Sequence, residues 1–144
     1  MAAETDALIS QLNITARRVQ AYLDVKLKPL NLTVNNYYFI LKIDQDTPLT
    51  QDQLFKRIYL SPSNVTRRLT QLIDLGLVEK QRNPQDGRSW TVTLTVKGKA
   101  LVPQVEQIIA QVNATAFNDL VTTQQEELIT ALKLIDHNLA QGGF

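Results

Sequence analysis

Apolar residues recur at intervals of three and four along most of this chain, a spacing typical of amphipathic helices. The pattern predicts helices over residues 6–28, 33–44, 51–59, 61–75, 95–117 and 123–139. Pro29 ends the first of them, because proline cannot donate the next helical hydrogen bond. Thr33 and Thr50 are the predicted N-caps of the second and third helices. The chain is therefore expected to be mainly α-helical.

The periodicity changes after Gly76, which is predicted to end the fourth helix in the left-handed conformation. Residues 77–81 and 90–94 are short runs rich in β-forming residues, and residues 82–89 between them are rich in turn formers. This pattern predicts a β-hairpin with a long basic tip. A helix, a tight break, a second helix, a glycine and a hairpin, in that order, are typical of a winged helix-turn-helix. The expected fold class is mainly α with a small β-hairpin.

Charge is unevenly distributed, although the whole chain carries only +1. Residues 56–99 contain nine basic and three acidic residues, whereas the rest contains six basic and eleven acidic ones. The central segment therefore carries +6 and the remainder −5. A solvated charged face is the ordinary explanation of such a segment. Because the positive charge coincides with the predicted helix pair and hairpin, we favour a surface that binds duplex DNA.

Composition also excludes several classes of protein. The chain has no cysteine and one histidine, His137, so neither a thiol redox switch nor a histidine-rich metal site is expected. The residues form no nucleophile–base pair, no paired carboxylates and no glycine-rich phosphate loop, so we predict no enzymatic activity and no cofactor. No apolar run is long enough to span a membrane, and the N-terminus does not resemble a signal peptide. A cytoplasmic location is expected.

The N-terminal part of the fourth helix carries the residues best suited to read bases. Asn and Arg side chains can form bidentate contacts with adenine and guanine, and hydroxyls suit phosphates or bases. Ser61 is expected only to cap this helix, since Pro62 follows at the first helical position. The predicted DNA-binding residues of the helix are Pro62, Ser63, Asn64, Thr66 and Arg67. Arg82 and Arg88 are the predicted contacts from the hairpin.

Four ordered segments resemble the multiple antibiotic resistance regulator (MarR) family. They are Ser63-Asn64-Val65-Thr66-Arg67, Leu72-Ile73-Asp74-Leu75-Gly76-Leu77-Val78, Asp86-Gly87-Arg88 and Leu94-Thr95-Val96-Lys97-Gly98. The last two resemble the wing pattern of that family. The resemblance covers nearly the whole chain, because long helices flank these segments where the family has its dimerisation helices.

The resemblance implies one MarR-like domain over residues 1–144, with a DNA-binding lobe at about 33–98 and dimerisation helices at about 4–30 and 99–144. It implies a homodimer that binds a pseudo-palindromic operator and acts as a repressor. Arg88 would enter the minor groove, Asp86 would hold Arg88 or a neighbouring basic residue through a charge-assisted bond, and Thr95 would cap the fifth helix. A small-molecule effector would bind between the terminal helices and the lobe, near Tyr37 and Tyr38.

Three points stay open at this stage. Tyr37 and Tyr38 are also compatible with a purely structural role in the core. Trp90 departs from the small or polar residue expected beside the wing, and it either stiffens the hairpin or packs against a neighbouring element. The alternative function is a winged-helix module that binds a protein partner and not DNA.

Overall fold

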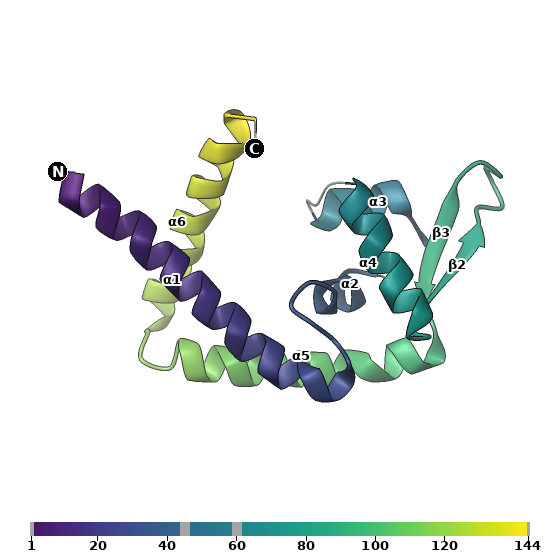
Figure 1. Ribbon diagram of the computed structural model, residues 1–144, viewed down its shortest axis with the longest axis horizontal. Helices are drawn as coiled ribbons and strands as arrows, with labels where there is room; N and C mark the ends of the chain where they lie inside the picture. The colour runs from purple at the N-terminus through teal and green to yellow at the C-terminus, as the bar shows by residue number, and fades with distance from the viewer. Residues whose placement is uncertain (1, 44–46, 59–61, 144) are drawn as a thin grey trace. The chain divides into compact units, whose positions relative to one another are not determined.

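The computed structural model describes residues 2–43, 47–58 and 62–143 (Figure 1). Its elements are α1 (Ala2–Leu27), η1 (Lys28–Leu30), α2 (Tyr37–Lys42), β1 (Leu49–Thr50), α3 (Gln51–Ile58), α4 (Pro62–Asp74), β2 (Val78–Arg82), β3 (Trp90–Leu94), α5 (Val96–Ala116) and α6 (Thr122–Gln141). The mainly helical fold with a basic hairpin is confirmed. The chain forms two compact units, residues 1–110 and 111–144.

The first unit has its core between α2, α3, α4 and the sheet. Leu54 of α3, Leu72 of α4 and Val92 of β3 are each 0% exposed. Leu27 at the end of α1 and Val105 in α5 are also fully buried. The C-terminal end of α1 and the first part of α5 therefore contribute side chains to the core of the same unit that contains the hairpin.

The sheet has three strands, one more than the hairpin predicted from the sequence. Its order is β1-β3-β2, and both pairings are antiparallel. Strand β1 has only two residues, which pair with Val92 and Thr91. The alternation of two residues cannot be recognised in a sequence, so this strand depends on its long-range pairing with β3.

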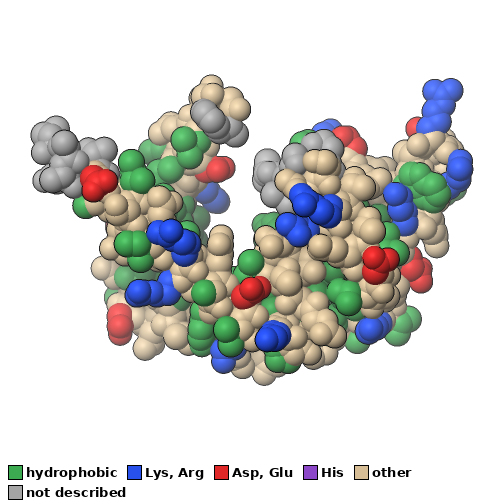
Figure 2. Space-filling model, in the orientation of Figure 1, with side chains coloured by type: hydrophobic (Ala, Val, Ile, Leu, Met, Phe, Trp, Pro, Cys, Tyr) green, Lys and Arg blue, Asp and Glu red, His purple; other side chains and the backbone are tan. Residues whose placement is uncertain are grey.

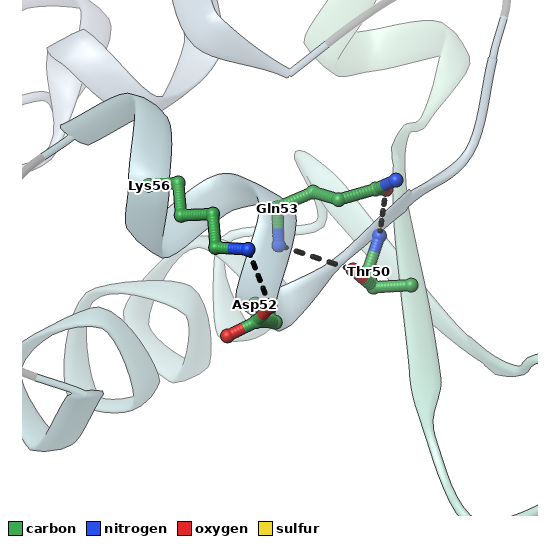
Figure 3. A network of polar contacts seen from close by, with 4 residues as sticks. All are labelled: Thr50, Asp52, Gln53 and Lys56. Atoms are coloured by element: carbon green, nitrogen blue, oxygen red, sulfur yellow. Dashed lines mark hydrogen bonds and ion pairs between the residues drawn. The ribbon is translucent and has the colours of Figure 1, made fainter.

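Thr50 links that short strand to the helix that follows it (Figure 3). The backbone N–H of Gln53 donates to Thr50 Oγ1 at 3.1 Å, and the Gln53 side chain accepts from the backbone N–H of Thr50 at 2.9 Å. These reciprocal bonds form a capping box, which satisfies two donors at the start of α3. The predicted cap at Thr50 is confirmed, and it fixes α3 directly to the sheet edge.

Two predicted helix starts need comment. Thr33 is not an N-cap: α2 begins at Tyr37, and the side chain of Asn36 accepts the backbone N–H of Thr33 at 2.8 Å. Residues 33–36 form a hydrogen-bonded turn before the helix. In this turn Thr33 Oγ1 also accepts the backbone N–H of Asn35 at 3.2 Å, so Thr33 caps the turn and not α2. Ser61, the expected cap of α4, and Asp44, the expected end of α2, lie outside the described residues.

The end of α4 and the start of α5 agree with the sequence prediction. Gly76 has a φ of +74°, and its N–H donates to Ile73 O at 2.9 Å, while the N–H of Leu77 donates to Leu72 O at 3.0 Å. These bonds are typical of a left-handed helix end. Thr95 Oγ1 accepts the N–H of Gly98 at 3.0 Å, which confirms it as the N-cap of α5.

The second unit contains the end of α5 and all of α6. Val112 of α5 is buried, whereas every described side chain of α6 is exposed. A pocket of about 490 Å³ lies between the two helices, lined in part by Phe117, Leu128, Ile129 and Leu132. The unit therefore presents an extensive apolar surface to its surroundings.

Candidate nucleic-acid interface

Helix α4 has one buried face and one exposed polar face. Val65, Leu69 and Leu72 are 2%, 2% and 0% exposed, and their spacing of three and four places them on one side of the helix. Ser63, Thr66 and Arg67 are exposed in the first turns. Pro62 is the first residue of the helix. The burial of the apolar face thus turns Ser63, Thr66 and Arg67 toward solvent, whereas Asn64 is half-buried.

Asn64 and Arg67 are joined on the exposed side of α4. Arg67 Nη2 donates a hydrogen bond to Asn64 Oδ1 across one helical turn. The guanidinium and the amide are the two groups on this helix best suited to bidentate base contacts. Their bond brings the two groups together on one side of the helix.

The hairpin tip is a compact turn organised by backbone and short polar side chains. Asn83 N–H donates to Ser89 O at 2.9 Å, and Ser89 N–H donates to Asp86 O at 3.1 Å. The side chain of Asn83 contributes two further bonds, one accepted from Gln85 N–H at 3.0 Å and one donated to Ser89 Oγ at 3.1 Å. The tip that carries Arg88 is therefore a defined structure rather than an extended loop.

Asp86 acts on Arg88 in a way that the sequence did not predict. Asp86 Oδ1 accepts the backbone N–H of Arg88 at 3.0 Å. The sequence predicted a charge-assisted bond from Asp86 to a basic side chain, and the bond in the structure goes to a backbone N–H. A carboxylate side chain is short and readily accepts the N–H two residues further along the chain, which closes a turn. Asp86 therefore shapes the backbone at the tip, and Arg88 remains exposed.

Arg82 ties the tip to strand β2. Its Nη1 donates to the carbonyl oxygen of Gly87 at 3.1 Å. The guanidinium carbon of Arg82 also lies 5.2 Å from the centre of the Trp90 ring, and Lys80 Nζ lies 5.1 Å from the same ring. Sequence reasoning named Arg82 as a hairpin contact, did not single out Lys80, and left open what Trp90 packs against. Figure 2 shows Lys and Arg side chains projecting from the hairpin.

The two tyrosines expected near an effector site are in contact at the start of α2. Their ring centres are 6.0 Å apart, with an interplanar angle of 65°, an edge-to-face arrangement. Lys42 Nζ lies 4.8 Å from the centre of the Tyr38 ring. Burial, and then the neighbouring Tyr38, raise the pKa of Tyr37 above its ordinary value of 10.0.

Both tyrosines line a pocket of about 510 Å³. Its other lining residues include Asn64 and Arg68 of α4, so the pocket lies within the winged-helix lobe, between α2 and the helix that carries the predicted base contacts. We expected a pocket against the terminal helices, and nothing in the sequence pattern indicated that α4 would form one wall. That wall depends on the packing of α2 on the α3–α4 pair.

Two kinds of site are absent from the described part of the chain. Among residues 2–43, 47–58 and 62–143, no group of three or more His, Asp or Glu side chains is arranged to hold a metal ion. None of the helices within these ranges combines the length and hydrophobicity needed to cross a bilayer.

An exposed polar helix face beside a basic hairpin, both built on one small helical core, defines a winged helix-turn-helix protein. The MarR family model matches residues 32–90, from the turn before α2 to the first residue of β3. Together with the structural similarities below, this match shows that the chain is similar to MarR-family transcriptional regulators with a winged-helix fold.

Solved structures of MarR-family proteins share this fold over most of their length. A MarR transcriptional regulator from Methanosarcina mazei Go1 is 24% identical, with a TM-score of 0.79 over 94% of this chain and 98% of that chain. A mutant of MarR from E. coli, complexed with operator DNA, is 26% identical, with a TM-score of 0.82 over 92% of this chain and 95% of that chain. A MarR-family regulator described as putative, from Listeria monocytogenes and complexed with 26mer DNA, is 22% identical, with a TM-score of 0.82 over 93% and 89%.

Proposed function

We propose that this protein is a sequence-specific transcriptional regulator that binds double-stranded DNA. The observation that carries the proposal is the placement, in one compact unit, of the polar face of α4 and the structured basic hairpin. A helix fits the major groove, and a hairpin beside it reaches adjacent phosphates or the minor groove. The two DNA-complexed structures with the same fold support this function.

Each part of this surface has its own task in the proposal. Ser63, Asn64, Thr66 and Arg67 contact base edges in the major groove, and the helix N-terminus at Pro62 faces the DNA backbone. Arg88 enters the minor groove, where narrow A·T-rich DNA concentrates negative potential. Asp86 and Arg82 hold the tip through the bonds described above. Specificity therefore comes from α4 and anchoring from the hairpin.

The proposed active form is a homodimer, and the apolar surface of the terminal helices supports it. Leu8 and Ile9 of α1 are 74% and 59% exposed, and Ile129 and Leu139 of α6 are 52% and 56% exposed. Exposed apolar side chains gathered on a helix in this way are typical of an interface. A two-fold dimer presents two recognition helices to half-sites about 10 bp apart, which matches a pseudo-palindromic operator.

The proposed action is repression, relieved by a small-molecule effector. A dimer on an operator blocks a promoter when the two overlap. The pocket at Tyr37 and Tyr38 is the proposed effector site, supported by its volume of about 510 Å³ and its mixed apolar and polar lining. An effector shifts the equilibrium only if it binds the DNA-free form more tightly.

The alternative, a winged helix that binds a protein partner without DNA, has less support. Such a surface would be expected to expose apolar residues on α4, as interface cores do. The exposed residues of α4 include Ser63, Thr66, Arg67, Thr70 and Gln71 instead.

A fluorescence anisotropy titration with duplex DNA from upstream of the gene tests the proposed function. The wild-type protein is expected to bind, with affinity that falls steeply as salt rises. Arg88→Ala should weaken binding and lower the slope of log K against log salt by about one. Lys28→Gln, which removes one exposed charge outside the basic segment 56–99, is the control and should leave the slope nearly unchanged.

Two outcomes would contradict parts of this function. Wild-type protein that binds no duplex in a salt-dependent way would favour the protein-interaction alternative. A monomer by light scattering after size-exclusion chromatography would contradict the two-half-site operator, even if DNA binding itself were retained.

A further inference from the structure

One face of the hairpin packs against the core near the base of the strands. Toward the tip, the same face carries exposed cationic and aromatic side chains. Side chains two residues apart on a strand share a face. The register pairs Val78 with Leu94, Lys80 with Val92, and Arg82 with Trp90. Val78, Leu94 and Val92 are buried, whereas Lys80, Arg82 and Trp90 are exposed. The hairpin thus changes from apolar to basic on one face as it leaves the core.

Trp90 is the shared partner of both cations on this face. Lys80 Nζ and Arg82 Cζ lie 5.1 and 5.2 Å from the ring centre, within the distance at which a cation is attracted by an aromatic ring. Arg82 has a second fixed point, because its Nη1 donates to Gly87 O at 3.1 Å. Glu79 directly precedes Lys80 in the sequence, but the alternation of the strand places it on the opposite face.

We propose that Trp90 is a positioning residue that holds Lys80 and Arg82 as a pair of contacts for DNA backbone phosphates. The inference rests on the proposed function and adds Lys80 and Trp90 to its surface. Long basic side chains lose rotamer freedom when they bind, and a ring that already orders them reduces that loss. Trp90 is 38% exposed, so burial in the core does not account for a tryptophan here.

Phosphates are the fitting ligand for this face. The pair lies on the strands, between the tip that carries Arg88 and the core, and this sheet face is the one turned toward the helices. Lys is a point charge with three donors and no fixed planar geometry, which suits phosphate oxygens better than one base edge. The same face displays no carboxylate among the residues paired in the β2–β3 register.

A double-mutant cycle separates this role from simple stiffening of the hairpin. Trp90→Leu is expected to weaken binding to a random-sequence duplex about five- to twentyfold, because both cations lose their platform. In a background of Lys80→Gln with Arg82→Gln, Trp90→Leu should cause no further loss. A loss of equal size in both backgrounds would overturn the proposal, since a structural tryptophan acts whether or not the cations are present.

The salt dependence supplies a second readout. The variant that lacks both cations should have a slope of log K against log salt lower by about two, at about 0.9 per phosphate contact. Trp90→Phe keeps a ring at this position and should retain more affinity than Trp90→Leu. Equal affinity of these two variants, or an unchanged slope in the double variant, would contradict the pairing.

Tryptophan fluorescence tests the contact even if a variant binds no DNA. The chain has one tryptophan, so all such emission reports on Trp90. Replacing both Lys80 and Arg82 by Gln should change the emission of the free protein, and Lys99→Gln should not. Identical spectra would overturn the proposal. If the wild type binds DNA in a salt-dependent way and the cycle is additive, only this inference fails and the proposed function stands.

Discussion

The hydroxyl of Thr95 donates a hydrogen bond of 2.6 Å to the carbonyl oxygen of Gly76. The same hydroxyl oxygen accepts the N–H of Gly98, so one side chain joins the end of α4 to the start of α5. Lys97 adds a bond from its Nζ to Leu75 O at 3.0 Å. Since exposed carbonyls at a helix end need partners, these contacts both satisfy α4 and couple it to α5.

Replacing Thr95 should measure that coupling. Thr95→Val keeps the shape of the side chain but loses both hydrogen bonds, and we expect a loss of about 1–2 kcal/mol in the free energy of unfolding. Thr95→Ser retains the hydroxyl and should stay within about 0.5 kcal/mol of the wild type. Urea unfolding followed by circular dichroism gives both values. Equal stability of the two variants would mean that the hydroxyl has no such role.

Gly98 is required by a close approach to the backbone of Leu77. A Cβ at this position would lie 2.1 Å from Leu77 O. Gly98→Ala should therefore destabilise the fold by about 2–3 kcal/mol, although alanine is the better helix former. Gly87 has no atom within 4 Å of such a Cβ, so Gly87→Ala is the matched control and should change stability by less than about 0.5 kcal/mol. Comparable stabilities for the two variants would refute the steric explanation.

The role of Asp86 can be tested through its geometry. Asp86→Asn keeps an oxygen that accepts the Arg88 N–H, whereas Asp86→Ala removes it. We expect the amide of Arg88 to exchange its hydrogen faster in the Ala variant only, and DNA affinity to fall about three- to tenfold in that variant. Loss of affinity in the Asn variant would instead support a role for the carboxylate charge.

Asn64 should affect which sequence is bound rather than how strongly DNA in general is held. A bidentate base contact discriminates by about 1–3 kcal/mol, so Asn64→Ala should relax the preference at one position of each half-site. Selection from a randomised duplex pool measures this preference. A uniform loss across all sequences would reassign Asn64 to the DNA backbone.

Tyr37 should make stability depend on alkaline pH. Its pKa in the folded protein is raised above the ordinary value of 10.0, so the folded state retains the proton when the unfolded chain releases it. The contribution to stability is therefore constant below about pH 10 and decreases as pH rises toward the folded pKa. Urea unfolding at pH 9 and pH 11 should show a larger decrease for the wild type than for Tyr37→Phe. Identical decreases would contradict the shift.

The sequence alone determined the features that depend on neighbours along the chain. The spacing of Val65, Leu69 and Leu72 fixed the buried face of α4, and with it the exposed face that carries Arg67. Gly76 and Thr95 marked helix ends because their conformational and hydrogen-bonding preferences are local. The concentration of basic residues between positions 56 and 99 is likewise visible in the sequence itself.

Only the tertiary structure decided the relationships between distant residues. Strand β1 exists through its pairing with β3, and the pocket at Tyr37 acquires Asn64 and Arg68 through the packing of helices. Trp90 could be assigned partners only after the strand register placed it opposite Arg82. Local preferences act over a few residues, whereas strand register and helix packing are selected by the whole core. A sequence pattern therefore predicts where a helix or strand lies more readily than it predicts which distant residues its side chains contact.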